Sequence, residues 1–238
     1  MNIIDFCKQI SPPFLTNYIL KLRNLKKRYY GLNELDKKLE KYINFDNGFF
    51  IELGANDGKT QSNTLYFERY RNWSGILVEP TPHNFLNCLS NRSVKTRVFC
   101  NACVSFDYDE KYVEIIYSNL MSTPVGLESD ISDPNAHAEL GAKFLKKNEV
   151  QFKFGSIAKT LNLIMKEANS PAIIDLLSLD VEGAELEVLK GIKFDQYSFR
   201  FMCIESRNID MIKSFLFIHN YELIDKLSEH DYLFKLNT

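Results

Sequence analysis

The sequence predicts a doubly wound α/β fold, a mostly parallel sheet of about seven strands with helices on both faces and an antiparallel terminal hairpin. Three observations support this class. From residue 49 onward, short apolar runs alternate with stretches of helical periodicity. The first run, residues 49–53, leads into a turn bounded by Gly54 and Gly58, which is typical of a buried strand before a helix. A second apolar strand, residues 76–78, ends in an acid about 20 residues after that turn, as in nucleotide-binding βαβ units.

Length and composition fit one such domain with a modest appendage. The chain has 238 residues, of which 45% are hydrophobic and 25% charged, the composition of a soluble globular protein. Its formal net charge of −2 gives no general attraction to nucleic acid, so nucleic acid is not an expected partner. No apolar run is long enough to span a membrane and the N-terminus does not resemble a signal peptide, so we expect a cytoplasmic protein.

The cysteines lack the spacing of a disulfide framework. They are Cys7, Cys88, Cys100, Cys103 and Cys203. Cys100 and Cys103 form one CxxC, but a structural zinc site needs a second pair or histidines at matching spacing. We therefore expect reduced thiols that pack in the core.

Residues 1–46 are predicted to form a helical extension before the main domain at 47–238. Apolar residues recur at helical spacing in 15–25 and again in 32–43, and a basic stretch, 21–28, lies between them. We interpret this stretch as the solvated face of a packed helix. The alternatives are a peripheral contact with the inner face of a membrane, and a contact within a homodimer.

The first strand carries an acid that needs a partner. Glu52 is costly to bury unless it meets a positive charge, so a ligand with an ammonium group would suit it. Gly54 and Gly58, with Ala55 and Asn56 between them, let the backbone approach such a ligand closely. The turn lacks the third glycine of a dinucleotide fingerprint, which argues against a nicotinamide oxidoreductase.

The helix predicted at residues 65–70 is preceded by Ser62 and Asn63, which could cap it or contact the ligand directly. After the second strand come Glu79 and Pro80. A carboxylate at this place can accept hydrogen bonds from both hydroxyls of a ribose.

The third strand is predicted at residues 96–100, after a helix at 82–91. Asn101 and Ala102 follow it, at a strand end where they could touch an adenine. Turn capping by Asn101 is the alternative.

The middle of the chain departs from this alternation. Residues 112–117 predict an extra strand, and residues 119–148 carry the densest turn chemistry in the chain. A long insertion near a site is often a lid or a binding loop, so we predict that role for 119–148. Within it, residues 136–147 could form a short helix.

The second half returns to strands and helices. Residues 151–154 form a short extended piece, and Ser156 is predicted to cap the next helix. The strands at 173–179 and 201–204 deliver Asp180 and Glu205. The remaining predicted elements are that helix, through Leu161, Ile164 and Met165, a helix through Leu186 and Leu189, a helix at 209–219, and an antiparallel pair at 221–224 and 232–236.

Three stretches of the sequence resemble the FkbM-type S-adenosylmethionine-dependent methyltransferases. They are IELGANDG at 51–58, WSGILVEP at 73–80 and LSLDVEGAE at 177–185, with an Ile-Glu pair at 204–205 beyond. The resemblance implies a Rossmann-like class I methyltransferase fold, S-adenosyl-L-methionine as cofactor, and O-methylation of sugar or natural-product hydroxyls. By motif position it implies that the cofactor is bound by Glu52, Gly54, Ala55, Asn56, Gly58, Ser62, Glu79, Pro80, Asn101, Ala102 and Asp180.

Methyl transfer to a hydroxyl also needs a group that removes the proton. Asp180 is the first candidate, with Glu205 and His137 as the others; capping of the next helix is the alternative for Asp180. Glu182, Glu205 and His137 are predicted to bind the acceptor substrate, and 119–148 would be its lid. Asp180, Glu182 and Glu205 could together hold a divalent metal, but capping and substrate binding explain the same carboxylates, so no metal is expected.

These residues favour a sugar O-methyltransferase that acts on a surface polysaccharide or related glycan, because several carboxylates suit the hydroxyls of a sugar. The alternative acceptor is a lipid-linked or secondary-metabolite hydroxyl, which the basic amphipathic N-terminal stretch suggests. A non-catalytic interaction module with the same fold is a third hypothesis. The carboxylates retained at so many strand ends argue against it.

Overall fold

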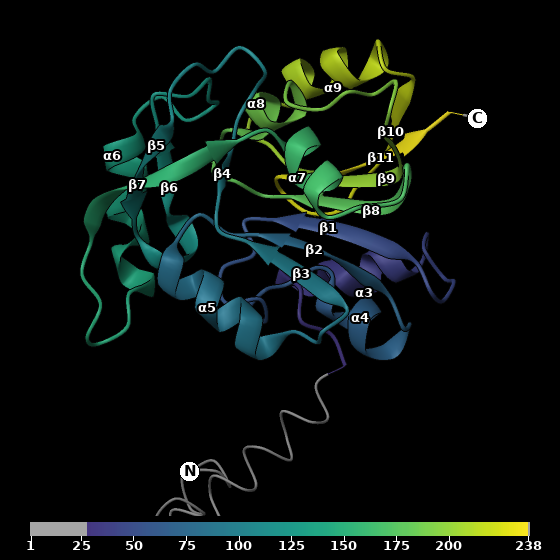
Figure 1. The fold of residues 1–238 in the computed structure, drawn as a ribbon, viewed down its shortest axis with the longest axis horizontal. Helices are drawn as coiled ribbons and strands as arrows, with labels where there is room; N and C mark the ends of the chain where they lie inside the picture. The colour runs from purple at the N-terminus through teal and green to yellow at the C-terminus, as the bar shows by residue number, and fades with distance from the viewer. Residues whose placement is uncertain (1–27, 238) are drawn as a thin grey trace, which may run out of the picture.

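The computed structural model describes residues 28–237. Within this range seven strands form one sheet in the order β10-β11-β9-β8-β1-β2-β3 (Figure 1). Strands β1, β2, β3, β8 and β9 pair in parallel, whereas β11 is antiparallel to both β9 and β10. The predicted fold class and terminal hairpin are therefore confirmed. The bounds are β1 Phe49–Leu53, β2 Ser74–Val78, β3 Thr96–Phe99, β8 Ile173–Leu179, β9 Ser198–Glu205, β10 Tyr221–Lys226 and β11 Asp231–Leu236.

Helices cover both faces of this sheet (Figure 1). Side chains of a strand alternate between the two faces, so Phe50 packs in one core cluster, while Ile51 and Leu53 pack in the other. The first cluster is covered by α3 (Leu35–Glu40), α4 (Leu65–Tyr70) and α5 (Pro82–Asn91), and the second by α7 (Leu161–Glu167), α8 (Glu185–Leu189) and α9 (Ile209–Phe217). The main sheet is thus buried on both sides, as its nearly continuous apolar strands require.

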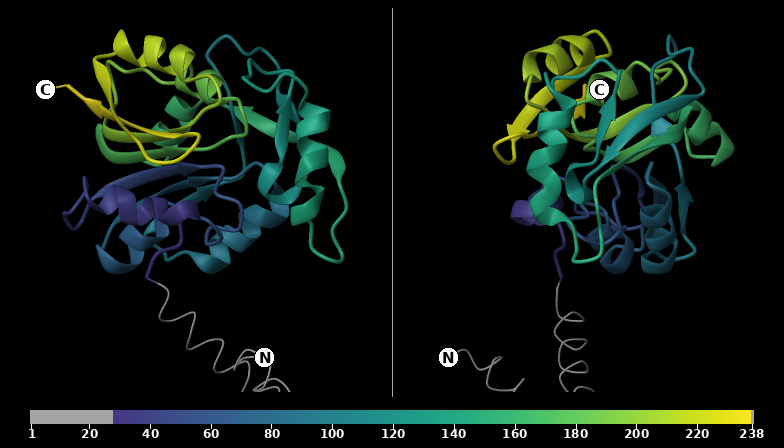
Figure 2. Two further views of the ribbon diagram at one scale, coloured as in Figure 1. Left: turned by 180° about the vertical axis from the view of Figure 1, so that it is seen from behind. Right: turned by 90° about the vertical axis from the view of Figure 1, so that its left-hand side faces the viewer.

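A second sheet, which the sequence did not predict as a unit, lies beside the first (Figures 1 and 2). It has four strands within the described range, in the order β4-β7-β5-β6. Their bounds are β4 Ala102–Cys103, β5 Tyr112–Tyr117, β6 Thr123–Val125 and β7 Phe152–Lys159. The extra strand at 112–117 is confirmed as β5. The short extended piece at 151–154 is instead the start of an eight-residue strand.

This longer strand corrects the prediction for Ser156. Ser156 lies inside β7, is buried, and donates its hydroxyl to the carbonyl of Pro80 at 3.2 Å. The residue that caps α7 is Thr160, whose side chain accepts from the amide of Leu163.

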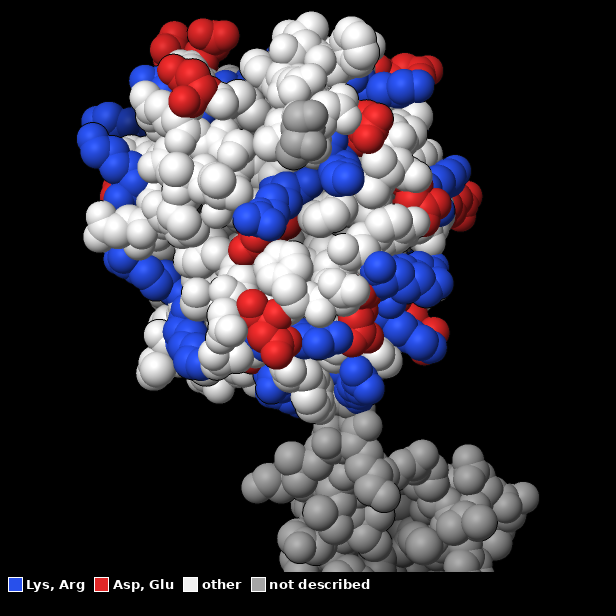
Figure 3. All heavy atoms as spheres, turned by 90° about the vertical axis from the view of Figure 1, so that its right-hand side faces the viewer, with Lys and Arg blue, Asp and Glu red and all other residues white. Residues whose placement is uncertain are grey.

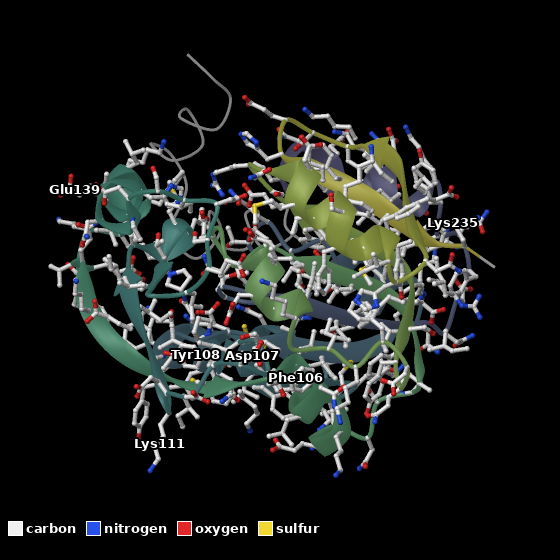
Figure 4. All side chains as sticks on the ribbon, turned by 90° about the horizontal axis from the view of Figure 1, so that it is seen from above. Phe106, Asp107, Tyr108, Lys111, Glu139 and Lys235 are labelled. Carbon is white, nitrogen blue, oxygen red and sulfur yellow. The ribbon has the colours of Figure 1, made fainter. Side chains whose placement is uncertain are left out.

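The predicted lid, residues 119–148, is folded onto the second sheet. It contains η2 (Asn119–Met121), β6, α6 (Pro134–Leu140) and η3 (Gly141–Phe144). The helix predicted at 136–147 begins earlier, because Asp133 caps it by accepting from the amides of Asn135 and Ala136, and it ends earlier, at Leu140. Figure 4 shows α6, which carries Glu139, at the end of the molecule away from Lys235 on β11.

Only part of the predicted N-terminal extension lies within the residues that the structure describes. A short 3-10 turn, η1 (Leu32–Glu34), and α3 lie within the predicted helical stretch at 32–43. The stretch at 15–25, Cys7 and most of the basic run lie outside the described residues. Within residues 28–237, none of the helices combines the length and the apolar character that a membrane crossing needs.

Candidate functional site

A pocket of about 390 Å³ opens where the parallel strands of the main sheet end and the second sheet begins. Ligand sites of α/β sheets lie at this edge, so its residues are the candidate site. Thirteen residues named from the sequence line it: Glu52, Gly54, Ala55, Asn56, Ser62, Asn63, Glu79, Pro80, Asn101, Ala102, Asp180, Glu182 and Glu205. Gly58 and His137 are not among the lining residues.

The glycine turn brings the ends of β1 and β8 into contact. Gly54 has a positive φ of 74°, and a Cβ there would lie 1.7 Å from the carbonyl oxygen of Asp180. Only glycine therefore allows this approach. Gly58 also has a φ of 74°, but its neighbour is Cys88 on α5, so its position serves the packing of the turn.

Glu52 finds its positive charge inside the protein. The guanidinium of Arg92, whose side chain is 0% exposed, donates to Glu52 at 3.3 Å and to Glu68 at 2.7 Å. A ligand ammonium group is therefore not needed to neutralise Glu52, and a contact between Glu52 and a ligand stays a prediction. The signal in the sequence was weak, because Arg92 follows a helix and is 40 residues away.

The remaining acceptor sites of Glu52 are also used. Its carboxylate accepts from the hydroxyl of Ser62 at 2.9 Å and from the amide of Asn63 at 2.8 Å. The Ser62 oxygen in turn accepts from the amide of Leu65, the first residue of α4, at 3.1 Å. Ser62 thus orders the start of this helix, while also lining the pocket.

Glu79 is the acid that ends β2. Its carboxylate is almost fully buried and accepts from the amides of Asn56 and Thr81, both at 2.9 Å. Burial raises the pKa of Glu79 to about 7, although these hydrogen bonds favour the ionised form. The side chains of Thr81 and Asn84 also interact with this carboxylate, which nevertheless lines the pocket.

Three further acids form a cluster at the ends of β8 and β9. Carboxylate oxygens of Asp180, Glu182 and Glu205 all lie within 4.8 Å of one another. Asp180 is exposed to the pocket, but the protein atoms around it, followed by the charges of Glu205 and Glu182, raise the pKa of Asp180 well above its ordinary value. A carboxylate crowded by other negative charges holds a proton more tightly than an isolated one, which makes it a stronger base.

Arg207, which the sequence reasoning missed, completes this cluster. Its Nη2 lies 3.3 Å from Glu182 and 3.6 Å from Glu205. An arginine two positions after a strand-end acid was the available signal. Three carboxylates suit a hard cation, but this guanidinium already supplies two of them with a positive charge, so the cluster alone does not define a metal centre.

His137 reaches the site only through Glu182. It lies on α6, and its Nε2 is 2.7 Å from a carboxylate oxygen of Glu182. Since His137 does not line the pocket, this contact connects the 119–148 segment to the acid cluster. It does not place the imidazole beside a substrate.

Asp130, also missed, ties the same segment to both strand-end turns. Its carboxylate accepts from the amides of Arg207 at 2.7 Å and Asn208 at 3.0 Å, and its own amide donates to the carbonyl of Gly183 at 3.0 Å. Glu185, which is 1% exposed, accepts from the amides of Val181 and Gly183. Burial raises the pKa of Glu185 to about 8.

The wall of the pocket that faces the main sheet is largely apolar, although Asn119 and Ser122 also line it. It comes from the second sheet and the 119–148 segment, with Ile115, Leu120, Met121, Pro124, Leu127 and Phe144. The site therefore has a polar floor at the strand ends and a hydrophobic wall opposite.

The comparison with protein families gives one clear match. A model of the methyltransferase FkbM domain matches residues 52–234, which include both parts of the site. No curated protein sequence is significantly similar to the chain.

Several solved structures are similar at low sequence identity. The FkbM methyltransferase from Methylobacillus flagellatus KT is 13% identical, over 93% of this chain and 59% of that chain, with a TM-score of 0.43. A protein assigned as an RNA methyltransferase from Pyrococcus horikoshii is 12% identical over 85% and 80%, with a TM-score of 0.42. Precorrin-6y C5,15-methyltransferase from Geobacter metallireducens GS-15 is 11% identical over 88% and 90%, with a TM-score of 0.41.

Proposed function

Because the chain belongs to the FkbM family of S-adenosylmethionine-dependent methyltransferases, we propose that it methylates a hydroxyl oxygen of a sugar, in a surface polysaccharide or related glycan. The observation that carries this proposal is the acid cluster of Asp180, Glu182 and Glu205, which opens into the same pocket as Glu79. A proton acceptor and a nucleoside-binding acid are thus available within one cavity.

The residues around Glu79 fit S-adenosylmethionine. Glu79 lines the pocket at the end of β2, where its carboxylate can meet the ribose hydroxyls, and Asn101 is held in place by donating its amide to the carbonyl of Ile157 at 3.1 Å. Because Gly54 has no side chain, the backbone beside Asp180 is not covered at this turn. When bound, S-adenosylmethionine supplies an electrophilic methyl carbon attached to a sulfonium.

Asp180 is the residue that we assign as the base. Its carboxylate takes the proton of the acceptor hydroxyl as the new oxygen–carbon bond forms and the sulfur–carbon bond breaks. The products are the methyl ether, S-adenosylhomocysteine and a protonated Asp180. Glu205 and Glu182 favour proton uptake through their negative charge, and Arg207 holds both of them in position.

The same carboxylates support a sugar as the acceptor. A sugar offers several hydroxyl donors, and the carboxylate oxygens of Glu182 and Glu205 can accept hydrogen bonds from them. His137 acts on the acceptor only through Glu182, whose carboxylate it contacts.

The test combines calorimetry with a turnover assay. We expect saturable binding of S-adenosylmethionine and methyl transfer to at least one member of a glycan panel. Asp180→Asn should bind the cofactor but lose about 100-fold to 10,000-fold in kcat, whereas Asp210→Asn, at an exposed position on α9, should match the wild type. Turnover of only non-sugar hydroxyls would reject the sugar assignment, and full activity of Asp180→Asn would reject the base.

A further inference from the structure

The hydrophobic wall of the pocket has no role in the acid–base chemistry described above. We propose that the acceptor carries an aliphatic group beside the hydroxyl that is methylated, and that this group lies on the wall formed by Leu120, Met121, Leu127 and Phe144. This inference rests on the proposed function, because it concerns the substrate of the same site. The acceptor would then be an amphiphile, such as a sugar attached to an alkyl or isoprenoid chain.

The wall is continuous with the acid cluster. Leu127 comes three residues before Asp130, which bonds directly to the backbone of Arg207 and Gly183. The acid cluster and the apolar wall line the same pocket of about 390 Å³, so a hydroxyl at Asp180 and the aliphatic group attached to it would share one cavity.

The rest of the wall is held as a unit. Met121 on η2 packs against η3, where a Cβ at Gly141 would lie 2.8 Å from the Met121 Cβ. Phe144, at the end of η3, lines the pocket and is still 37% exposed. Leu32 lines the same pocket from η1 and is 50% exposed. Binding of an apolar ligand group would remove these surfaces from water, which favours binding.

The side-chain types distinguish an aliphatic ligand from a bare sugar. Phe144 is the one aromatic residue among the described residues that line the pocket. Sugar rings pack on flat aromatic faces such as those of Trp and Tyr, whereas flexible Leu and Met side chains suit alkyl groups. A free sugar would satisfy the carboxylates but leave this wall uncovered.

The experiment compares matched acceptors. Methyl and n-octyl glycosides of the same sugars are assayed with saturating S-adenosylmethionine, below the micelle concentration of the octyl compounds. Each buried methylene lowers KM by about fourfold, so we expect the KM of an octyl glycoside to be at least about tenfold lower at a similar kcat.

Variants then locate the effect. Met121→Gln and Phe144→Ala should remove most of the octyl preference while cofactor affinity, measured by calorimetry, stays unchanged. Phe217→Ala is the matched control, because Phe217 is 77% exposed on α9 and outside the pocket. Equal KM values for methyl and octyl glycosides would overturn the inference. Loss of cofactor affinity in both wall variants would also overturn it, because the wall would then belong to the cofactor.

Failure of the proposed function gives a different result. The complex with S-adenosylhomocysteine is titrated with an octyl glycoside, without turnover. One outcome is that no glycoside is methylated, but the octyl glycoside binds saturably and Met121→Gln abolishes this binding. That result would support the apolar subsite and reject the assignment of sugar methylation. Absence of binding to the folded complex would reject the subsite.

Discussion

The pKa of the Glu79 carboxyl group is set by two opposing effects. Burial disfavours its charge, while the amides of Asn56 and Thr81 favour it. The result, a pKa of about 7, makes the ionisation of this residue sensitive to pH in the physiological range.

We predict that cofactor affinity follows this ionisation. Ribose hydroxyls donate to the carboxylate, so binding of S-adenosylmethionine should become about tenfold weaker between pH 8 and pH 6, as Glu79 is protonated. Glu79→Gln should weaken binding by about 1.5–3 kcal/mol at pH 8 and remove most of the pH dependence. Titration calorimetry at both pH values measures this, with Glu139→Gln, exposed on α6, as control. An unchanged pH dependence in Glu79→Gln would contradict the assignment.

Arg92 is the second decisive residue, because it neutralises two buried acids. We predict that Arg92→Met lowers the free energy of unfolding by about 3–5 kcal/mol, since Glu52 and Glu68 lose their buried partner. Arg97→Met, at an exposed position on β3, should change it by less than about 0.5 kcal/mol. Urea denaturation compares the two variants, and equal midpoints would show that the buried network contributes no stability.

At the scale of elements, the important feature is the attachment of the 119–148 segment to the main sheet. Asp130 bonds to the turn after β9 and to the turn after β8, while His137 bonds to Glu182. These contacts fix the acid cluster from outside the pocket, so Asp130 is a positioning residue.

We predict that Asp130→Ala lowers kcat by about 10-fold to 100-fold, because the carboxylates lose their alignment. Cofactor affinity should change little, since Glu79 is on another strand. Asp133→Ala is the matched control, because Asp133 caps α6 in the same segment without contacting either turn. Steady-state kinetics and calorimetry on both variants decide the matter; an equal loss of kcat in the control would indicate general loosening of the segment.

The second sheet shows why the sequence did not predict the full length of β7. Gly155 and Ser156 look like turn residues, so the local sequence predicts a break in the strand. In the structure residues 152–157 of β7 pair with β5, and residues 158–159 pair with β4. Long-range pairing overrides local propensity here, and sequence periodicity does not report such pairing.

At the scale of the whole molecule, the formal net charge of −2 is small. Figure 3 shows acidic and basic side chains interspersed on the face that it presents. Three acids with raised pKa values, Glu79, Asp180 and Glu185, lie at or just after the strand ends that form the pocket, and Asp36 and Asp231 also have raised pKa values. The stability of the protein without ligand should therefore depend on pH through this region.

We predict that stability falls as pH rises from about 5 to about 8.5. The unfolded chain releases the Glu185 proton near the ordinary pKa of 4.5, whereas the folded protein keeps it up to about 8, so folding is favoured below this window. Glu185→Gln keeps an acceptor for the amides of Val181 and Gly183. It should reduce the fall in the free energy of unfolding over this pH range by about 2–4 kcal/mol. Urea midpoints at pH 5.5, 7 and 8.5 measure this. If the urea midpoints of the variant and the wild type changed equally with pH, Glu185 would not be the source of the pH dependence.

The sequence alone determined the main sheet and the acids at its edge. Apolar strands followed by glycine or acid locate Gly54, Glu79, Asp180 and Glu205, and parallel topology brings their strand ends to one edge. This information is local, since each motif lies within a few residues of its own strand.

Only the tertiary structure revealed the partners of these residues. Arg92 is 40 residues from Glu52, and Asp130 is 77 residues from Arg207, distances at which no periodicity indicates a contact. The tertiary structure also showed that His137 contacts Glu182 and does not line the pocket, and that a hydrophobic wall faces the acids. The physical reason is that charge neutralisation and wall packing depend on side chains brought together by folding, whereas strand ends depend on local pattern.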